Sequence, residues 1–144
     1  MCIRDRSNST WYSDGYVPIG DDLLAGGYGN ELEWINNANV DFDFGGIVND
    51  IAFQFMDGGG NLNIEINGDF RNINEFSDID GLSVGGTSVV LGGTPSYGTL
   101  YINGTIDSFS VGGQELNIDN VWYVPEPATL LLLGLGGLML RKNK

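Results

Sequence analysis

The chain contains no histidine, and Cys2 is its only cysteine. The absence of histidine excludes Ser-His-Asp and Cys-His catalysis, together with zinc or iron sites built on imidazole ligands. A single cysteine cannot close an intrachain disulfide or supply a thiolate cluster for a metal. We therefore assign no catalytic residue and expect that the protein is not an enzyme.

Basic side chains are equally scarce in the central part of the chain. Residues 7–124 contain one cation, Arg71, and seventeen aspartates and glutamates, which gives a net charge of −16. Nucleic-acid binding needs Lys and Arg to neutralise phosphates, so we expect no nucleic-acid partner. An anionic membrane surface would repel this region for the same reason.

Residues 1–6 differ in character from the rest of the chain. They carry the only cysteine and two of the six basic residues, and they resemble the adapter-derived start of gene fragments assembled from metagenomes. An exported protein begins with a basic region and an apolar run of about 7–15 residues, whereas the longest early apolar run here is Leu23-Leu24-Ala25. We expect residues 1–6 to be an assembly artefact, residues 7–30 to be irregular, and the true signal peptide to be missing.

Residues 31–124 are expected to form one all-β domain. Apolar side chains alternate with polar ones at Ile51-Phe53-Phe55, Leu62-Ile64-Ile66 and Leu116-Ile118, and this period of two is typical of half-buried strands. No soluble helix is predicted, and further strands are predicted at 31–35, 39–44, 70–76, 82–91 and 99–111. The polar side chains that alternate with the apolar ones are expected to face water: Gln54, Asn61, Asn63, Glu65, Asn67, Asn117 and Asp119.

Glycine-rich segments separate the predicted strands. Asn67-Gly68 and Asn103-Gly104 are the strongest hairpin signals, because Asn-Gly readily adopts the positive φ angles of a type I′ turn. Segments 57–61, 92–95 and 112–113 are also predicted turns. Turns spaced by about 8–12 residues are typical of a sandwich or barrel, so we expect an antiparallel β-sandwich with one core.

Three features succeed one another at the C-terminus. Pro125 and Pro127 restrict φ and, with Glu126 before a proline, favour an extended tether. Residues 128–140 carry no charge. As a helix they would be about 20 Å long, which is shorter than the hydrocarbon core of a bilayer, about 30 Å. Basic flanking residues whose side chains extend to the membrane surface would reduce this difference in length. The basic end, which we expect to stay in the cytoplasm, comprises Arg141, Lys142 and Lys144.

This ordered tail resembles the PEP-CTERM sorting signal. The resemblance rests on the motif Pro125-Glu126-Pro127, the apolar run and the basic end. It implies an exported protein of a Gram-negative, exopolysaccharide-producing bacterium. It also implies processing near the motif by an exosortase, a membrane-embedded cysteine transpeptidase, after transient anchoring in the inner membrane.

Segment 106–121, IDSFSVGGQELNIDNV, carries a second resemblance. It is similar to the last hairpin of jelly-roll domains that precede PEP-CTERM tails. Similar closing strands occur in carbohydrate-binding jelly rolls, where an aspartate often contributes to a structural calcium site, and the resemblance gives that role to Asp119. The expected architecture is thus a β-sandwich of jelly-roll type, an extended tether and one short C-terminal hydrophobic helix.

Structural calcium is the one candidate cofactor, since this ion prefers several oxygen ligands and the domain is rich in Asp and Asn. The interpretation that we favour is that these side chains instead accept hydrogen bonds from the backbone of their own turns. The candidate ligands are Asp119, Asp57, Asn61, Asp78 and Asp80.

Extracellular polysaccharide is a candidate partner, because exposed aromatic rings would serve as stacking platforms. Trp11, Tyr12 and Tyr16 lie in a Ser/Asp/Gly-rich region without strand periodicity and are the candidate residues. Trp122 instead alternates with Leu116 and Ile118, so we expect it in the core.

Three roles remain for the domain. The first is an exported, surface-sorted structural or matrix-associated protein, and the alternative is an extracellular carbohydrate-binding module. The third, a glycoside-acting enzyme, would need two carboxyl groups at a defined separation. No spacing selects such a pair among Glu31, Glu33, Glu65, Glu75 and Glu115.

Overall fold

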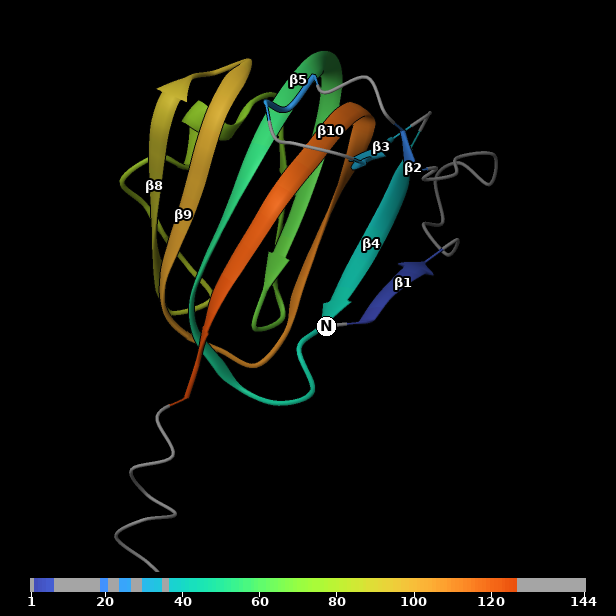
Figure 1. Cartoon of the computed structure of the whole chain (residues 1–144). Coiled ribbons are helices and arrows are strands. Elements are labelled where there is room, and N and C mark those ends of the chain that lie inside the picture. The colour runs from blue at the N-terminus through green and yellow to red at the C-terminus, as the bar shows by residue number, and fades with distance from the viewer. Residues whose placement is uncertain (1, 7–18, 21–23, 27–29, 35–36, 127–144) are drawn as a thin grey trace, which may run out of the picture.

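The computed structural model describes residues 2–6, 19–20, 24–26, 30–34 and 37–126. These residues form an almost entirely antiparallel β structure, as predicted, with its strands arranged in two facing layers (Figure 1). The strands are β1 (Cys2–Arg6), β2 (Ile19–Gly20), β3 (Glu31–Glu33), β4 (Ala38–Asp43), β5 (Val48–Ile66), β6 (Asp69–Ile73), β7 (Ser83–Val84), β8 (Thr87–Thr94), β9 (Tyr97–Ile106) and β10 (Phe109–Pro125).

The long strands β5 and β10 pair with each other along their whole length and contribute to both layers. Residues 48–56 of β5 also pair with β9, whereas residues 62–66 pair with β6. The first layer therefore contains β7, β8, β9, the first half of β5 and the second half of β10. The second layer contains β6, the second half of β5, the first half of β10, β4 and β1.

Glycines make the corner at which β5 and β10 pass from one layer to the other. Gly59 and Gly60 have φ angles of 120° and 85°, and the register of β10 shifts on both sides of Glu115. Extra residues of this kind bend a strand pair and let it change layers. The predictions that 57–61 and 112–113 end strands were therefore wrong, because glycine at positive φ serves a bend as well as a turn.

The core lies between the two layers and contains the predicted apolar residues. Phe53 is fully buried, and its ring centroid lies 5.9 Å from Phe76 and 5.8 Å from Phe109. Phe109 belongs to the second layer and Phe53 to the first, so this contact joins the two sheets. All seven residues predicted for the core are at most 1% exposed: Phe53, Phe55, Leu62, Ile64, Ile66, Leu116 and Ile118.

The predicted hairpin turn at Asn67-Gly68 is confirmed. Ile66 pairs with Asp69, and the two residues between them both have positive φ, 52° and 80°, as a type I′ turn requires. The Asn67 amide nitrogen donates to Thr105 O at 2.9 Å, and its Oδ1 accepts from Asp107 N at 2.8 Å. The turn therefore also fixes the connection from β9 to β10.

The second hairpin signal, Asn103-Gly104, was wrong. Both residues lie inside β9, where the register against β5 shifts between Asn49 and Ile51. Gly104 has a φ of 130° and donates its N–H to Asp50 Oδ1 at 2.8 Å. The pair forms a bulge, which uses the same positive φ without reversing the chain.

Three predicted strands are divided or end earlier than expected. The strand predicted at 82–91 is divided at residues 85–86 into the antiparallel strands β7 and β8. The strand predicted at 99–111 is divided at residues 107–108 into β9 and β10. The strand predicted at 70–76 stops at Ile73 and is succeeded by a short 3-10 helix, η1 (Phe76–Ile79), although no helix was predicted. Phe76 and Ile79 are buried, so η1 closes one end of the core with two apolar side chains.

The N-terminal part of the chain adds strands to the edges of both layers. Residues 2–6, which we expected to be an artefact, form β1 and pair antiparallel with β4, while β2 pairs with β3. Glu31 at the start of β3 is 2% exposed and accepts from the backbone N–H of Leu24 at 3.0 Å and of Ala25 at 2.8 Å. It also accepts from Asn117 Nδ2 at 2.9 Å. Asn117 is 5% exposed, so its predicted place on the outer face was wrong.

Several predicted features lie outside the described residues. Among the residues that the structure describes, no helix combines the length and the apolar character that crossing a membrane would take. The features outside these residues are Trp11, Tyr12, Tyr16, Pro127, the apolar run 128–140, Arg141, Lys142 and Lys144.

Candidate functional site

Trp122 faces solvent, so the prediction that it belongs to the core was wrong. Asp119 pairs with Gln54 and Trp122 with Ala52, so β10 has one more residue than β5 over this stretch. The extra residue is accommodated at Asn120, whose φ is 48° and whose Nδ2 donates to Gln54 Oε1 at 2.6 Å. One inserted residue reverses the alternation beyond it, and Trp122 is consequently 50% exposed.

This reversal places Trp122 in a row of side chains across the outer face of the first layer. Trp122 pairs with Ala52, Ala52 with Tyr101, and Tyr101 with Val90. Residues directly opposite in antiparallel strands share one face. Tyr101 is 44% and Val90 42% exposed. We call Val90, Tyr101, Ala52 and Trp122 the outer aromatic row; it crosses β8, β9, β5 and β10, which lie side by side in Figure 1.

Polar residues border the outer aromatic row on both sides. Gly92, Thr99, Gln54 and Asp119 pair in sequence across the same four strands on one side, and Ser88 pairs with Asn103 on the other. The Tyr101 ring lies close to Gly92, since a Cβ atom added at Gly92 would lie 3.0 Å from Tyr101 Cε2. The row is thus an apolar strip bordered mostly by hydroxyl and amide side chains, with the Asp119 carboxylate at its β10 end.

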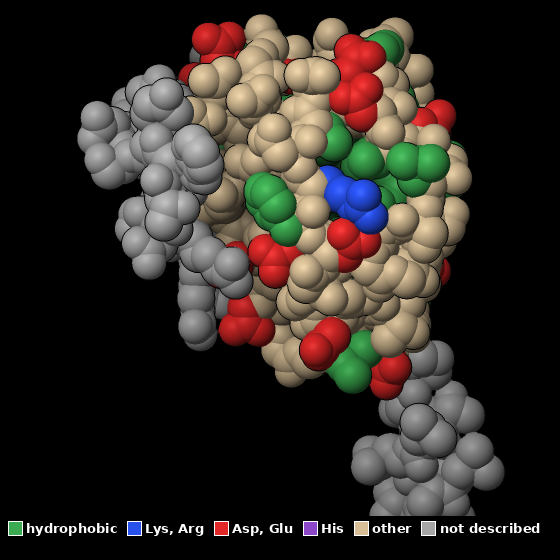
Figure 2. All heavy atoms as spheres, turned by 180° about the vertical axis from the view of Figure 1, so that it is seen from behind, with side chains coloured by type: hydrophobic (Ala, Val, Ile, Leu, Met, Phe, Trp, Pro, Cys, Tyr) green, Lys and Arg blue, Asp and Glu red, His purple; other side chains and the backbone are tan. Residues whose placement is uncertain are grey.

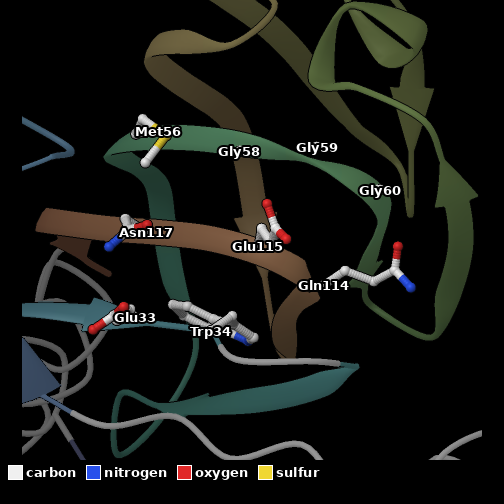
Figure 3. A pocket seen from close by; sticks show the side chains of 9 residues that line it. All are labelled: Glu33, Trp34, Met56, Gly58, Gly59, Gly60, Gln114, Glu115 and Asn117. Carbon is white, nitrogen blue, oxygen red and sulfur yellow. The ribbon is translucent and has the colours of Figure 1, made fainter.

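A cleft of about 540 Å³ lies at the corner where β5 and β10 bend. Figure 3 shows Gln114 and Glu115 on β10 opposite the glycines of β5, with Trp34 across the cleft. Glu33 also lines it, but in Figure 3 its carboxylate points away from that of Glu115. The cleft therefore holds two carboxylates without bringing them face to face.

The candidate calcium ligands accept hydrogen bonds from the backbone. Asp57 Oδ1 accepts from Gly59 N at 2.9 Å, and Asp119 Oδ1 from Asn120 N at 2.6 Å. Asp78 Oδ2 accepts from Asn74 N at 2.9 Å and Asp80 Oδ1 from Leu91 N at 2.8 Å, while Asn61 is exposed. Within the described ranges, no three acidic side chains gather in a group that would hold a metal ion.

A melting experiment distinguishes a specific calcium site from simple screening of the acidic side chains. We expect calcium chloride and sodium chloride at matched ionic strength to raise the melting temperature equally, because both would screen repulsion among the acidic side chains. A specific site would instead give a calcium response that grows by mass action at micromolar to millimolar concentration. Loss of that response in Asp119→Asn would place the site at β10.

The environment of Asp57 opposes ionisation of its carboxyl group. Burial raises its pKa, the hydrogen bond from Gly59 N lowers it, and the nearby charges of Glu75 and Glu115 raise it further; the net direction is upward. A folded-state pKa above the unfolded one favours folding at low pH, and that contribution is lost as pH rises through the folded value.

We accordingly expect Asp57→Asn to raise the melting temperature at pH 7, because the amide keeps an oxygen for Gly59 N and carries no charge. The gain should shrink as pH falls through the raised pKa of Asp57 and vanish below about pH 4, where the carboxyl group is protonated in both states. Asp43→Asn on the exposed end of β4 is the control. A gain that is constant between pH 3 and pH 7 would contradict the role of this ionisation.

Comparison with known proteins identifies the tail. Residues 124–143 match the family model described as the PEP-CTERM protein-sorting motif. No curated protein and no solved structure matches the chain. The prediction of the sorting motif is confirmed, and this motif supports an exported protein that an exosortase processes.

Proposed function

We propose that the β-sandwich is a structural or matrix-associated protein of a polysaccharide-rich bacterial surface layer. The observation that carries this proposal is the direct junction between the domain and the sorting motif. Pro125, the first residue of the Pro-Glu-Pro triplet, is the last residue of β10 and pairs with Val48. Domain and motif thus meet without a linker, which supports delivery of this domain to the surface by the tail.

The described part of the domain offers little support for a catalytic role. The two glutamates of the corner cleft diverge (Figure 3), whereas glycoside hydrolysis requires two carboxyl groups placed on either side of one bond. The chain also contains no histidine for acid–base catalysis. A non-catalytic role in the surface layer is therefore the better-supported proposal.

The sorting role predicts a defined processing phenotype. In an exosortase-positive host, we expect the double variant Pro125→Ala, Pro127→Ala to accumulate unprocessed, because the extended conformation that the prolines impose is lost. The gel shift between precursor and product measures this. Pro95→Ala, in the loop between β8 and β9, should be processed normally. Normal processing of the double variant would show that the two prolines are not needed for sorting.

The matrix role is tested separately by fractionation. We expect the processed protein to sediment with the extracellular polysaccharide and to be released into the medium in a host that makes none. Release in both hosts would refute matrix association while leaving export intact.

A carbohydrate-binding module is a second candidate, and the outer aromatic row favours it. Trp122 and Tyr101 are both exposed on one sheet face that is bordered by amide and hydroxyl side chains. Aromatic residues of this kind combine an apolar body with a polar edge and are frequent at binding surfaces.

A further inference from the structure

We infer that the outer aromatic row binds an uncharged glycan chain that lies across strands β8, β9, β5 and β10. The inference deepens the proposed matrix role by naming the surface that would hold the polysaccharide and the chemical class that fits it. It involves Trp122 and Tyr101, whose rings lie on one face only because of the bulge at Asn120.

The spacing of the two rings suits an extended polymer. Trp122 and Tyr101 are separated by one strand, and two strand spacings amount to about 10 Å. Ala52, the residue between them, has the smallest side chain of the row and leaves a shallow floor. Two apolar platforms with a low floor between them match a chain of pyranose rings, each of which has a flat face of C–H groups.

The borders of the row suit the hydroxyl groups of such a chain. Thr99 and Gln54 lie on one side of the strip, with Ser88 and Asn103 on the other. A hydroxyl group both donates and accepts hydrogen bonds, as do amide and hydroxyl side chains. A sugar ring stacked over β8, β9 and β5 would therefore reach neutral polar partners, and at the β10 end it would meet the Asp119 carboxylate, which accepts hydrogen bonds from hydroxyl groups.

Charge restricts the ligand to an uncharged glycan. Arg71 is the only basic residue between positions 7 and 124, and it lies on β6 in the opposite layer, paired with Asp69 at 2.9 Å. Figure 2 views that opposite face and shows basic side chains at one place among acidic side chains spread over the surface. An acidic polysaccharide would be repelled by residues 7–124, whose net charge is −16, and would find no cation beside the row.

The same features disfavour a second copy of the chain or another acidic protein. Two such domains would repel each other, and protein interfaces centre on a desolvated core within a polar rim. On β8, β9 and β5 the side chains beside the outer aromatic row are polar, among them Ser88, Asn103, Thr99 and Gln54. A linear ligand that runs along the strip is the better fit.

Binding to neutral glycans tests the inference. The full chain, inserted in nanodiscs of uncharged lipid, is measured by biolayer interferometry on immobilised dextran, laminarin and xyloglucan, with hyaluronan as the acidic comparison and empty nanodiscs as the blank. We expect at least one neutral glycan to bind and hyaluronan not to bind. Trp122→Ala and Tyr101→Ala should each weaken binding by about tenfold or more, because each removes a large apolar contact.

Phe70→Ala provides the matched control, since Phe70 is 55% exposed on β6 in the opposite layer. It should bind like the unaltered chain, and melting curves verify that every variant is folded. The inference is overturned if no neutral glycan binds, if hyaluronan binds equally well, or if folded Trp122→Ala keeps full affinity. Concentration-dependent dimerisation that Trp122→Ala abolishes would assign the row to a second copy instead.

The two proposals fail in different ways. If the full chain binds none of the glycans but still sediments with matrix polysaccharide in cells, the matrix role stands and this surface is wrong. If it binds a neutral glycan in vitro and is nevertheless released from matrix-producing cells, the surface stands and the matrix role is wrong.

Discussion

Replacing Phe53 by alanine should lower the free energy of unfolding by about 3–5 kcal/mol, the range for a fully buried phenylalanine. Phe53 is 0% exposed and contacts the rings of Phe76 and Phe109. Its removal leaves a cavity between the layers, and β5, which carries it, pairs with both β9 and β10 and cannot readily move to fill it. We expect the melting temperature to fall by about 10 °C or more.

Thermal and urea unfolding monitored by circular dichroism measure this effect. Phe70→Ala removes the same side chain from an exposed position of β6 and should change stability by about 0.5 kcal/mol or less. Equal melting temperatures for the two variants would mean that Phe53 is not in the core. A helix-rich spectrum for the unaltered protein would contradict the β-sandwich itself.

The core could be predicted because alternation in the sequence reflects burial directly. In β5 and β10 one side of each strand faces the opposite layer, so an apolar residue at every second position identifies the inner face. Phe53, Leu62 and Ile118 were found in this way without knowledge of how the strands pair. The method works as long as a strand contains no inserted residue.

Trp122 shows where the alternation of apolar residues no longer predicts burial. The segment Asp119-Asn120 places two polar residues in succession, and this interruption was a readable sign that the alternation can restart in the other phase. Whether an interruption is a bulge or a harmless variation depends on the φ of one residue. At Asn120 that angle is positive, which asparagine tolerates better than most residues.

Glycine segments were ambiguous for a related reason. Asn67-Gly68 reverses the chain, whereas Asn103-Gly104 makes a bulge in β9 and Gly59-Gly60 makes a corner in β5. In each case glycine supplies a positive φ at low cost. The pairing partner on the neighbouring strand decides the outcome, and it is distant in the sequence.

The sorting motif and the outer aromatic row also differ in whether local sequence reveals them. The sorting motif is linear, so its residues could be recognised from their order alone. The outer aromatic row joins residues 52, 90, 101 and 122 through the register of four strands. No local pattern contains it, although the Asp119-Asn120 interruption was a sign that Trp122 could face outward.

Buried polar contacts were also beyond a local pattern, and Glu31 provides the second large expected effect. Its carboxylate accepts hydrogen bonds from Leu24 N, Ala25 N and Asn117 Nδ2, all at 2.8–3.0 Å. Glu31→Ala would leave the buried Asn117 amide and a buried backbone N–H without acceptors. Each buried donor that is left without an acceptor costs about 1–3 kcal/mol, so we expect the free energy of unfolding to fall by about 3 kcal/mol or more.

The loss should be local as well as global, since Glu31 joins residues 24–25 to β10. Limited proteolysis should cut Glu31→Ala near Ala25 at protease concentrations that leave the unaltered protein intact. Glu33→Ala, on the same strand but only partly buried, is the matched control and should change stability by about 0.5 kcal/mol or less.

A double variant distinguishes the effect of an unsatisfied hydrogen-bond donor from that of a general packing defect. Adding Asn117→Val to Glu31→Ala removes the amide that the first substitution leaves unsatisfied, and a pair replaced by apolar groups costs less than a broken pair. We therefore expect the double variant to be more stable than Glu31→Ala alone. If the two substitutions were instead simply additive in destabilisation, Glu31 would act through packing, and its hydrogen bond to β10 would contribute nothing to holding the N-terminal segment on the sandwich.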